Sequence, residues 1–229
     1  MPCSKNLLND AGIKGLIFDF DGTLFNKAFF GFFLIAAYPP DFFKILKERL
    51  VRKRLAGCDF ETPEKYYNEF FSSLGKSCSL SSLQMQNWYT GVYMPRMVSI
   101  LKKHFKPREG VKRLFAFLEA SCNFKTAVYS DYPFLRERME ALGLKTGKNI
   151  LLFSPDSFGA QKPAAGPFIS IAKDFSIPPQ EALVAGDRYK TDGLGALNAK
   201  MHFYHVRSNR RWKEFVNTIL SSPLPAYTD

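Results

Sequence analysis

Short apolar runs recur along the chain, and most of them end in a polar residue. They cover residues 15–18, 125–129, 150–153, 182–185 and 202–206. Runs of this length are typical of buried strands. The first ends at Asp19, the second at Ser130, and the fourth at the pair Gly186-Asp187. We therefore expect strands that carry polar side chains at their carboxyl ends.

Helical patterns separate these runs. Apolar residues recur at helical spacing over residues 110–120, 133–142, 167–175 and 191–199. Alternating strands and helices predict an α/β fold, with a doubly wound parallel sheet covered on both faces. Ligands of such sheets bind beyond the carboxyl ends of the strands, where the polar residues fall.

The interval between the first two strands is unusually long. About 80 residues, 26–105, intervene, whereas a crossover needs only a dozen or so. They contain helical patterns over residues 41–56, 63–74 and 81–104, the last interrupted at Pro95. We expect an inserted α-helical domain over residues 27–105, and a core domain formed by residues 1–26 and 106–229.

The most apolar part of the insert covers residues 28–38 and is followed by Pro39-Pro40. It is too short to span a bilayer, which needs about 20 apolar residues. We expect a buried or interface helix and no membrane contact. The neighbouring phenylalanines would pack inside the insert, although they could also line an apolar substrate pocket or a dimer surface.

Charge narrows the range of partners. The formal net charge is +11, and a basic surface attracts phosphorylated metabolites, nucleic acid and anionic lipid. The absence of a basic repeat with interspersed aromatic residues argues against nucleic acid.

Residues 1–9 form no apolar leader, and the four cysteines are far apart, which predicts a cytoplasmic protein with reduced thiols. The oligomeric state stays open.

The first strand leads into Asp19-Phe20-Asp21-Gly22-Thr23. Gly22 permits a turn that would bring both carboxylates to one site. One carboxylate could attack phosphorus while the other transfers protons. Alone, the motif is equally compatible with an Asp-Gly turn whose carboxylates are solvated.

Three later elements add to this motif. Ser130 could donate to a phosphate oxygen or cap a helix, and Lys162 could neutralise charge or lie on the surface. Asp187 and Asp192 follow another strand, and Mg²⁺ prefers carboxylate and water oxygens. Each element alone is a weak indication of a catalytic site, but the ordered set of four is a specific one.

This ordered set resembles the haloacid dehalogenase-like superfamily over residues 11–25 and 106–207. The resemblance implies that Asp19 is the nucleophile that forms an aspartyl-phosphate, that Asp21 is the general acid and base, and that Lys162 assists catalysis. It implies that Mg²⁺ is held by Asp19, Asp187, Asp192 and the backbone carbonyl of Asp21. It implies a phosphate site formed by Ser130, Lys162, Asp131, Gly22 and Thr23.

The implied function is Mg²⁺-dependent hydrolysis of a small phosphorylated metabolite. Family members that cleave carbon–halogen bonds generally lack the second carboxylate, so Asp21 favours phosphoryl chemistry. The insert resembles the helical cap of many members. Phosphosugar mutase chemistry uses nearly the same residues and stays open, as does phosphonate cleavage through an imine on Lys27 or Lys44. A different class is a non-catalytic protein that binds anions or nucleic acid on the same fold.

A dense basic run crosses the insert. Its residues are Lys44, Lys47, Arg49, Arg52, Lys53 and Arg54. They could recognise a second anionic group on the substrate, or they could form a solvated helix face.

Overall fold

The computed structural model describes residues 12–121 and 124–222. Within them a parallel sheet has the order β3-β2-β1-β4-β5. Its strands are β1 (Gly15–Asp19), β2 (Lys125–Tyr129), β3 (Ile150–Phe153), β4 (Ala182–Gly186) and β5 (His202–His205). The predicted α/β fold is confirmed, and each strand end lies within one residue of its predicted position.

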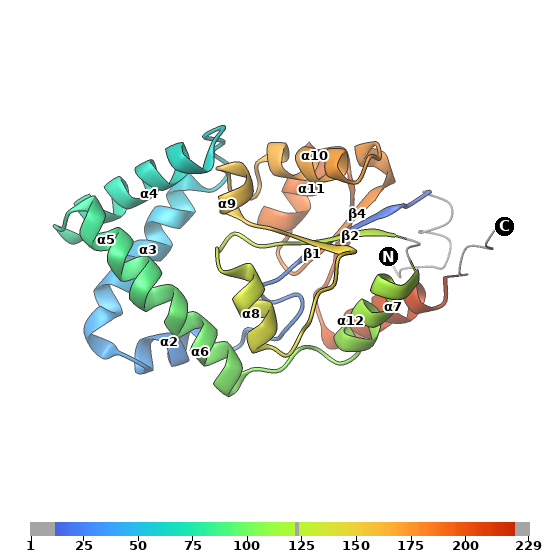
Figure 1. Cartoon of the computed structure of the whole chain (residues 1–229), viewed down its shortest axis with the longest axis horizontal. Coiled ribbons are helices and arrows are strands. Elements are labelled where there is room, and N and C mark those ends of the chain that lie inside the picture. The colour runs from blue at the N-terminus through green and yellow to red at the C-terminus, as the bar shows by residue number, and fades with distance from the viewer. Residues whose placement is uncertain (1–11, 122–123, 223–229) are drawn as a thin grey trace.

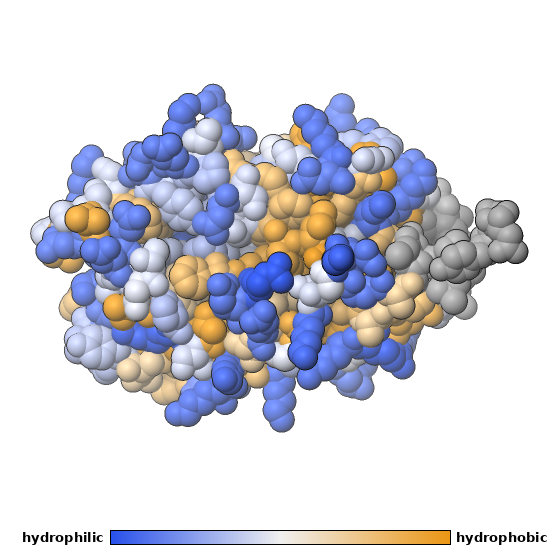
Figure 2. Space-filling model, viewed as in Figure 1, coloured by the Kyte–Doolittle hydropathy of each residue, from blue (hydrophilic) through white to orange (hydrophobic). Residues whose placement is uncertain are grey.

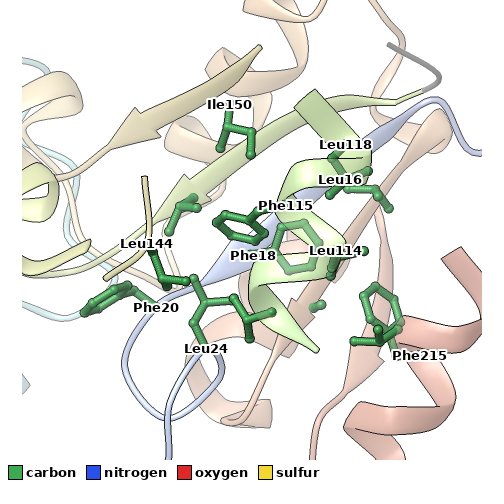
Figure 3. Packing of buried hydrophobic residues seen from close by; sticks show 14 of the residues in the cluster. Leu16, Phe18, Phe20, Leu24, Leu114, Phe115, Leu118, Leu144, Ile150 and Phe215 are labelled. Atoms are coloured by element: carbon green, nitrogen blue, oxygen red, sulfur yellow. The ribbon is translucent and has the colours of Figure 1, made fainter. Parts of the chain in front are cut away.

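Helices cover both faces of the sheet (Figure 1). One face carries α7 (Val111–Ser121), α8 (Leu135–Ala141) and α12 (Asn209–Leu220), and the other carries α10 (Ala165–Asp174) and α11 (Leu194–Asn198). Alternate residues of β1 supply the two cores, because successive side chains of a strand point to opposite faces. Phe18 packs against Phe115 and Phe215 on the first face (Figure 3), and Ile17 belongs to the core of the second.

Three core helices differ from their predicted ranges. Helix α8 begins two residues late, at Leu135. Helix α10 begins two residues early, at Ala165. The helix predicted over residues 191–199 is divided into a π-helical turn, Tyr189–Gly193, and the short α11. A short helix, α9 (Pro155–Phe158), follows β3.

The expected helical insertion lies between β1 and β2, beyond the carboxyl ends of the strands (Figure 1). It consists of α2 (Phe30–Ala36), α3 (Phe42–Leu55), α4 (Pro63–Cys78), α5 (Ser82–Trp88) and α6 (Met94–His104). The interruption predicted at Pro95 is displaced: a π-helical turn, Tyr89–Tyr93, lies directly before α6. Pro95 is tolerated in the first turn of α6, where its missing N–H costs no intrahelical bond.

The insertion has its own hydrophobic core around Ile45, Phe70 and Met85. The prediction that its phenylalanines pack inside is wrong for Phe29 and Phe32, which are 77% and 65% exposed, and for Phe43, which is 72% exposed. Helix α2 has only seven residues, of which Leu34 alone is buried. A helix of about two turns buries one face, and Phe32 lies on its exposed face.

Hydrophilic residues dominate the face shown in Figure 2, with a smaller apolar area near its middle. No helix in residues 12–121 and 124–222 combines the length and the apolar character needed to cross a bilayer. The segments 1–11, 122–123 and 223–229 of the predicted core domain lie outside the described residues.

Phe215 provides a test of the packing on the α7–α12 face. It is fully buried, with ring contacts to Phe18, Tyr204 and Trp212. Phe215→Ala should lower the free energy of unfolding in urea by about 3–5 kcal/mol, because it leaves a cavity in the core. The matched control Phe43→Ala removes the same ring from an exposed position and should change it by no more than about 0.5 kcal/mol. Equal losses from both variants would contradict this packing.

Candidate active site

The polar strand ends meet at one edge of the sheet. Asp19 is the last residue of β1, Ser130 follows β2 and Asp187 follows β4. Asp192 lies in the π-helical turn after β4, where a Cβ on Gly186 would be only 2.4 Å from the Cβ of Asp192. Gly186 therefore lets Asp192 turn back onto the strand end.

Lys162 is the centre of the site. Its Nζ donates to Asp19 Oδ1 at 2.7 Å and to Asp192 Oδ1 at 2.8 Å, and the side chain is only 2% exposed. Burial alone lowers the pKa of this ammonium, but the Asp19 and Asp192 carboxylates raise it well above its ordinary range. The lysine therefore stays charged between two carboxylates.

Asp19 is fixed at both carboxylate oxygens. Oδ1 accepts from Lys162, and Oδ2 accepts from the buried Thr23 hydroxyl at 2.8 Å. Burial, followed by the charge of Asp192, raises the pKa of Asp19 from 3.8 to about 6 despite the opposing effect of Lys162. The group therefore ionises just below neutral pH.

Asp19, Asp187 and Asp192 form an acidic group whose oxygens lie within 4.8 Å of one another. Asp187 Oδ1 is buried without a hydrogen-bond partner. Burial and the charge of Asp19 raise the pKa of Asp187. An all-oxygen carboxylate set with one unsatisfied buried oxygen fits a hard cation such as Mg²⁺.

Lys27 was not predicted to contribute in this way. Its Nζ lies 2.7 Å from Asp187 Oδ2 and donates to the backbone carbonyl of Asp21 at 2.7 Å. Gly22 makes room for this approach. It has φ +99°, and a Cβ there would lie 2.3 Å from Asp187 Oδ2. Lys27 thus contacts two of the groups expected to hold Mg²⁺.

The Asp21 side chain turns away from the acidic group. Its Oδ2 accepts from the Ser130 hydroxyl at 3.0 Å, and its Oδ1 pairs with Arg138. Burial raises the pKa of Asp21, but the Arg138 guanidinium outweighs burial and leaves the pKa below its usual value. Asp21 is therefore held in its ionised form.

Sequence reasoning missed Arg138, which is fully buried and lies over the Phe20 ring. The sequence did contain an indication that Arg138 is buried. Within the predicted helix, Arg138 shares helical spacing with Leu135, Met139 and Leu142, all of which are buried. A charged residue at such a position requires a buried partner.

The residues expected to hold phosphate already have protein partners. The Ser130 hydroxyl accepts from Arg138 at 2.9 Å and from the Tyr132 amide at 3.1 Å. The Asp131 carboxylate accepts from the Lys162 amide at 3.0 Å, and burial raises its pKa. Ser130 is therefore bonded to Asp21, and Asp131 is bonded to the Lys162 backbone.

A cavity of about 660 Å³ lies between the core and the insertion, lined by Asp21, Asp131 and Lys162 from the core. A second hollow of about 490 Å³ is lined by Gly22, Lys27 and Asp187. Lys27 lines both cavities and pairs with Asp187. Lys162 lines the larger cavity and contacts Asp19 and Asp192. The acidic group therefore lies beside the larger cavity.

The residues of the basic run in the insertion differ in burial and in their contacts. Arg52 is not part of a solvated helix face. It is buried, pairs with Glu48 and donates to the Tyr89 hydroxyl at 2.7 Å. It also donates to the backbone carbonyl of Asp131 at 2.7 Å, which joins the insertion to the loop after β2. The solvated-face interpretation is therefore wrong for Arg52, whose guanidinium contacts buried hydroxyls of the insertion.

The family model of the haloacid dehalogenase-like hydrolases matches residues 13–200. The chain therefore belongs to this family of hydrolytic enzymes, as its motifs predicted. No curated protein sequence matches the chain significantly.

Solved structures share the fold. A predicted phosphoglycolate phosphatase from Haemophilus somnus 129pt is 17% identical, with a TM-score of 0.56 over 85% of each chain. A HAD family hydrolase from Deinococcus radiodurans R1, with bound phosphate and sodium, is 19% identical, with a TM-score of 0.51 over 86% of this chain and 81% of that one. A 2-haloacid dehalogenase from Pseudomonas syringae pv. Tomato DC3000 is 18% identical, with a TM-score of 0.53 over 83% and 85%.

The raised pKa of Asp19 predicts a pH-dependent stability. Without metal, the folded protein takes up a proton on Asp19 near pH 6, whereas the unfolded chain does so near 3.8. The Asp19 contribution to stability is therefore full below pH 3.8 and is lost as the pH rises through 6. Asp19→Asn cannot ionise, so its stability relative to wild type should increase between pH 4 and pH 7 by on the order of 2 kcal/mol.

Urea unfolding in the presence of a chelator measures this difference. Asp174→Asn neutralises an exposed carboxylate and is the matched control for the substitution itself. A constant difference between Asp19→Asn and wild type from pH 4 to pH 7 would show that Asp19 has an ordinary pKa.

Proposed function

We propose that the protein is a Mg²⁺-dependent phosphatase that hydrolyses a small phosphomonoester through an aspartyl-phosphate on Asp19. The observation that supports this most strongly is the position of Asp19. It lies at the end of β1, 2.7 Å from the Lys162 ammonium and within 4.8 Å of the Asp187 and Asp192 carboxylates.

Asp19 is the nucleophile in this proposal. Attack of a carboxylate on a phosphate dianion meets like-charge repulsion, which Lys162 reduces at the attacking group. The Thr23 hydroxyl holds one carboxylate oxygen, and Lys162 holds the other. Both bonds restrict rotation of the carboxylate, so the nucleophile is oriented before the substrate arrives.

The metal would be held by the Asp19, Asp187 and Asp192 carboxylates and by the Asp21 backbone carbonyl. When bound, Mg²⁺ neutralises negative charge around the nucleophile and stabilises charge on the transferring oxygens. The chain supplies the ligands on a strand end, a turn and a loop that are already packed together, so little reorganisation is needed.

Asp21 is the proposed general acid and base, and it lines the cavity. Its bonds to Arg138 and Ser130 stabilise the ionised form, which is the form needed to activate water. To protonate a leaving oxygen, Asp21 must first take up a proton from water, so its bond to Arg138 has to weaken before that step. A carboxylate placed for this role favours phosphoryl transfer over carbon–halogen cleavage, which needs no proton for its leaving group.

A phosphatase assay over a panel of phosphomonoesters, with Mg²⁺ or with chelator, tests this function. Wild type should release free phosphate only with Mg²⁺. Asp19→Asn should lower kcat at least about 1000-fold because the nucleophile is lost, and Asp21→Asn about 100-fold or more because proton transfer is lost. Asp174→Asn is the control for a neutralised exposed carboxylate. Wild-type turnover by Asp19→Asn, or an isomerised phosphosugar in place of free phosphate, would exclude the proposal.

Metal binding is tested without turnover. Saturating Mg²⁺ should raise the Tm of wild type by roughly 5 °C, because a ligand at about 100 times its Kd stabilises a protein by about 2.7 kcal/mol. Asp187→Asn should lose most of this rise, whereas Asp174→Asn should keep it. An equal rise in Asp187→Asn would place the metal elsewhere.

A further inference from the structure

The cavity above the site carries a large excess of positive charge. Seven of its lining residues are cationic and two, Asp21 and Asp131, are acidic. Three of the cations are occupied by carboxylates: Lys27 by Asp187, Arg52 by Glu48, and Lys162 by Asp19 and Asp192. The excess positive charge of the cavity therefore comes from the four other cationic residues.

These four are Arg49, Lys53, Arg188 and Lys190. All are exposed, and none forms a salt bridge with a carboxylate in the part of the chain that the structure describes. Like charges that line one concave surface raise its potential and attract anions. Such a surface favours an anionic ligand group beyond the one at Asp19.

Their positions divide them between the insertion and the core. Arg49 and Lys53 are four residues apart on α3, so they lie on one face of that helix. Arg49 is accommodated by Gly31 of α2, where a Cβ would lie 2.7 Å from the guanidinium. Arg188 and Lys190 belong to the turn that also carries Asp192. An anion bound among them would contact both parts of the molecule.

The same cavity has an apolar portion formed by Phe30, Leu34 and Met97. Its volume of about 660 Å³ lies within the range of small-molecule sites, about 300–1,000 Å³. A phosphate group alone would fill little of it. The space is suited to a ligand with a carbon skeleton between two charged ends.

We infer that this cavity selects phosphomonoesters that carry a second anionic group, a carboxylate or another phosphate, and that Arg49 and Lys53 bind that group. The inference rests on the proposed phosphatase function and adds its substrate class. The reacting phosphate lies at Asp19 and Lys162, and the second anion lies towards α3. Arg188 and Lys190 add to the positive potential from the core side.

Two matched substrate pairs test the inference. In the first pair, 3-phosphoglycerate carries a carboxylate where glycerol 3-phosphate carries a hydroxymethyl group. In the second, fructose 1,6-bisphosphate carries a second phosphate that fructose 1-phosphate lacks. Wild type should show a kcat/KM at least about tenfold higher for the doubly anionic member of one pair or of both, which identifies the anion that the site accepts.

The Arg49→Ala/Lys53→Ala double variant should reduce that ratio about tenfold, mainly through KM of the doubly anionic substrate. Lys47→Ala/Arg54→Ala is the matched control. It removes two positive charges from the same helix at positions outside the cavity lining, and its ratio should equal that of wild type.

Calorimetric titration of the same compounds into Asp19→Asn with Mg²⁺ needs no turnover, so it separates this inference from the phosphatase proposal. Binding should be at least about tenfold tighter for a doubly anionic compound and should lose that preference when Arg49 and Lys53 are also replaced. No preference in either pair, a preference that survives Arg49→Ala/Lys53→Ala, or an equal loss in Lys47→Ala/Arg54→Ala would overturn the inference.

Discussion

Carboxylates gather at the carboxyl ends of β1, β2 and β4, and the fold has to neutralise them with cations that are themselves buried. Lys162 lies between Asp19 and Asp192, and Arg138 pairs with Asp21. Removal of one partner from a buried ion pair leaves an uncompensated charge, which costs about 3–5 kcal/mol. Pairing keeps these buried charges compensated, and in the proposed function the same fixed charges would stabilise a phosphate dianion and a divalent cation.

The insertion takes part in this arrangement through Arg52. This residue is held by Glu48 and Tyr89 within the insertion and reaches the Asp131 carbonyl of the core. Asp131 in turn accepts from the Lys162 amide. A movement of α3 therefore changes the surroundings of the loop that carries Lys162, which connects the proposed substrate-recognition surface on α3 to the reacting centre.

The strands, and the meeting of Asp19, Asp187 and Asp192 at their ends, were predictable because apolar runs, helical spacing and ordered carboxylates are local features. The roles of Arg138 and Arg52 were harder to predict. A charged side chain on a buried helix face is understood only when its distant partner is known, and Asp21 lies far from Arg138 in sequence. Phe29 and Phe43 were placed inside because their hydrophobicity suggests burial, but exposure depends on which helix face packs. The direction of the Asp21 carboxylate is likewise set by tertiary contacts.

The proposed mechanism depends on transfer of the phosphoryl group to Asp19. A rapid acid quench during turnover of a phosphomonoester with Mg²⁺, followed by proteolysis and mass spectrometry, tests it directly. We expect a phosphoryl group on the peptide that contains Asp19, assigned by fragmentation to that side chain and absent from Asp19→Asn. A phosphoryl group on any other residue, or turnover with unmodified Asp19 under conditions that trap acyl phosphates, would contradict it.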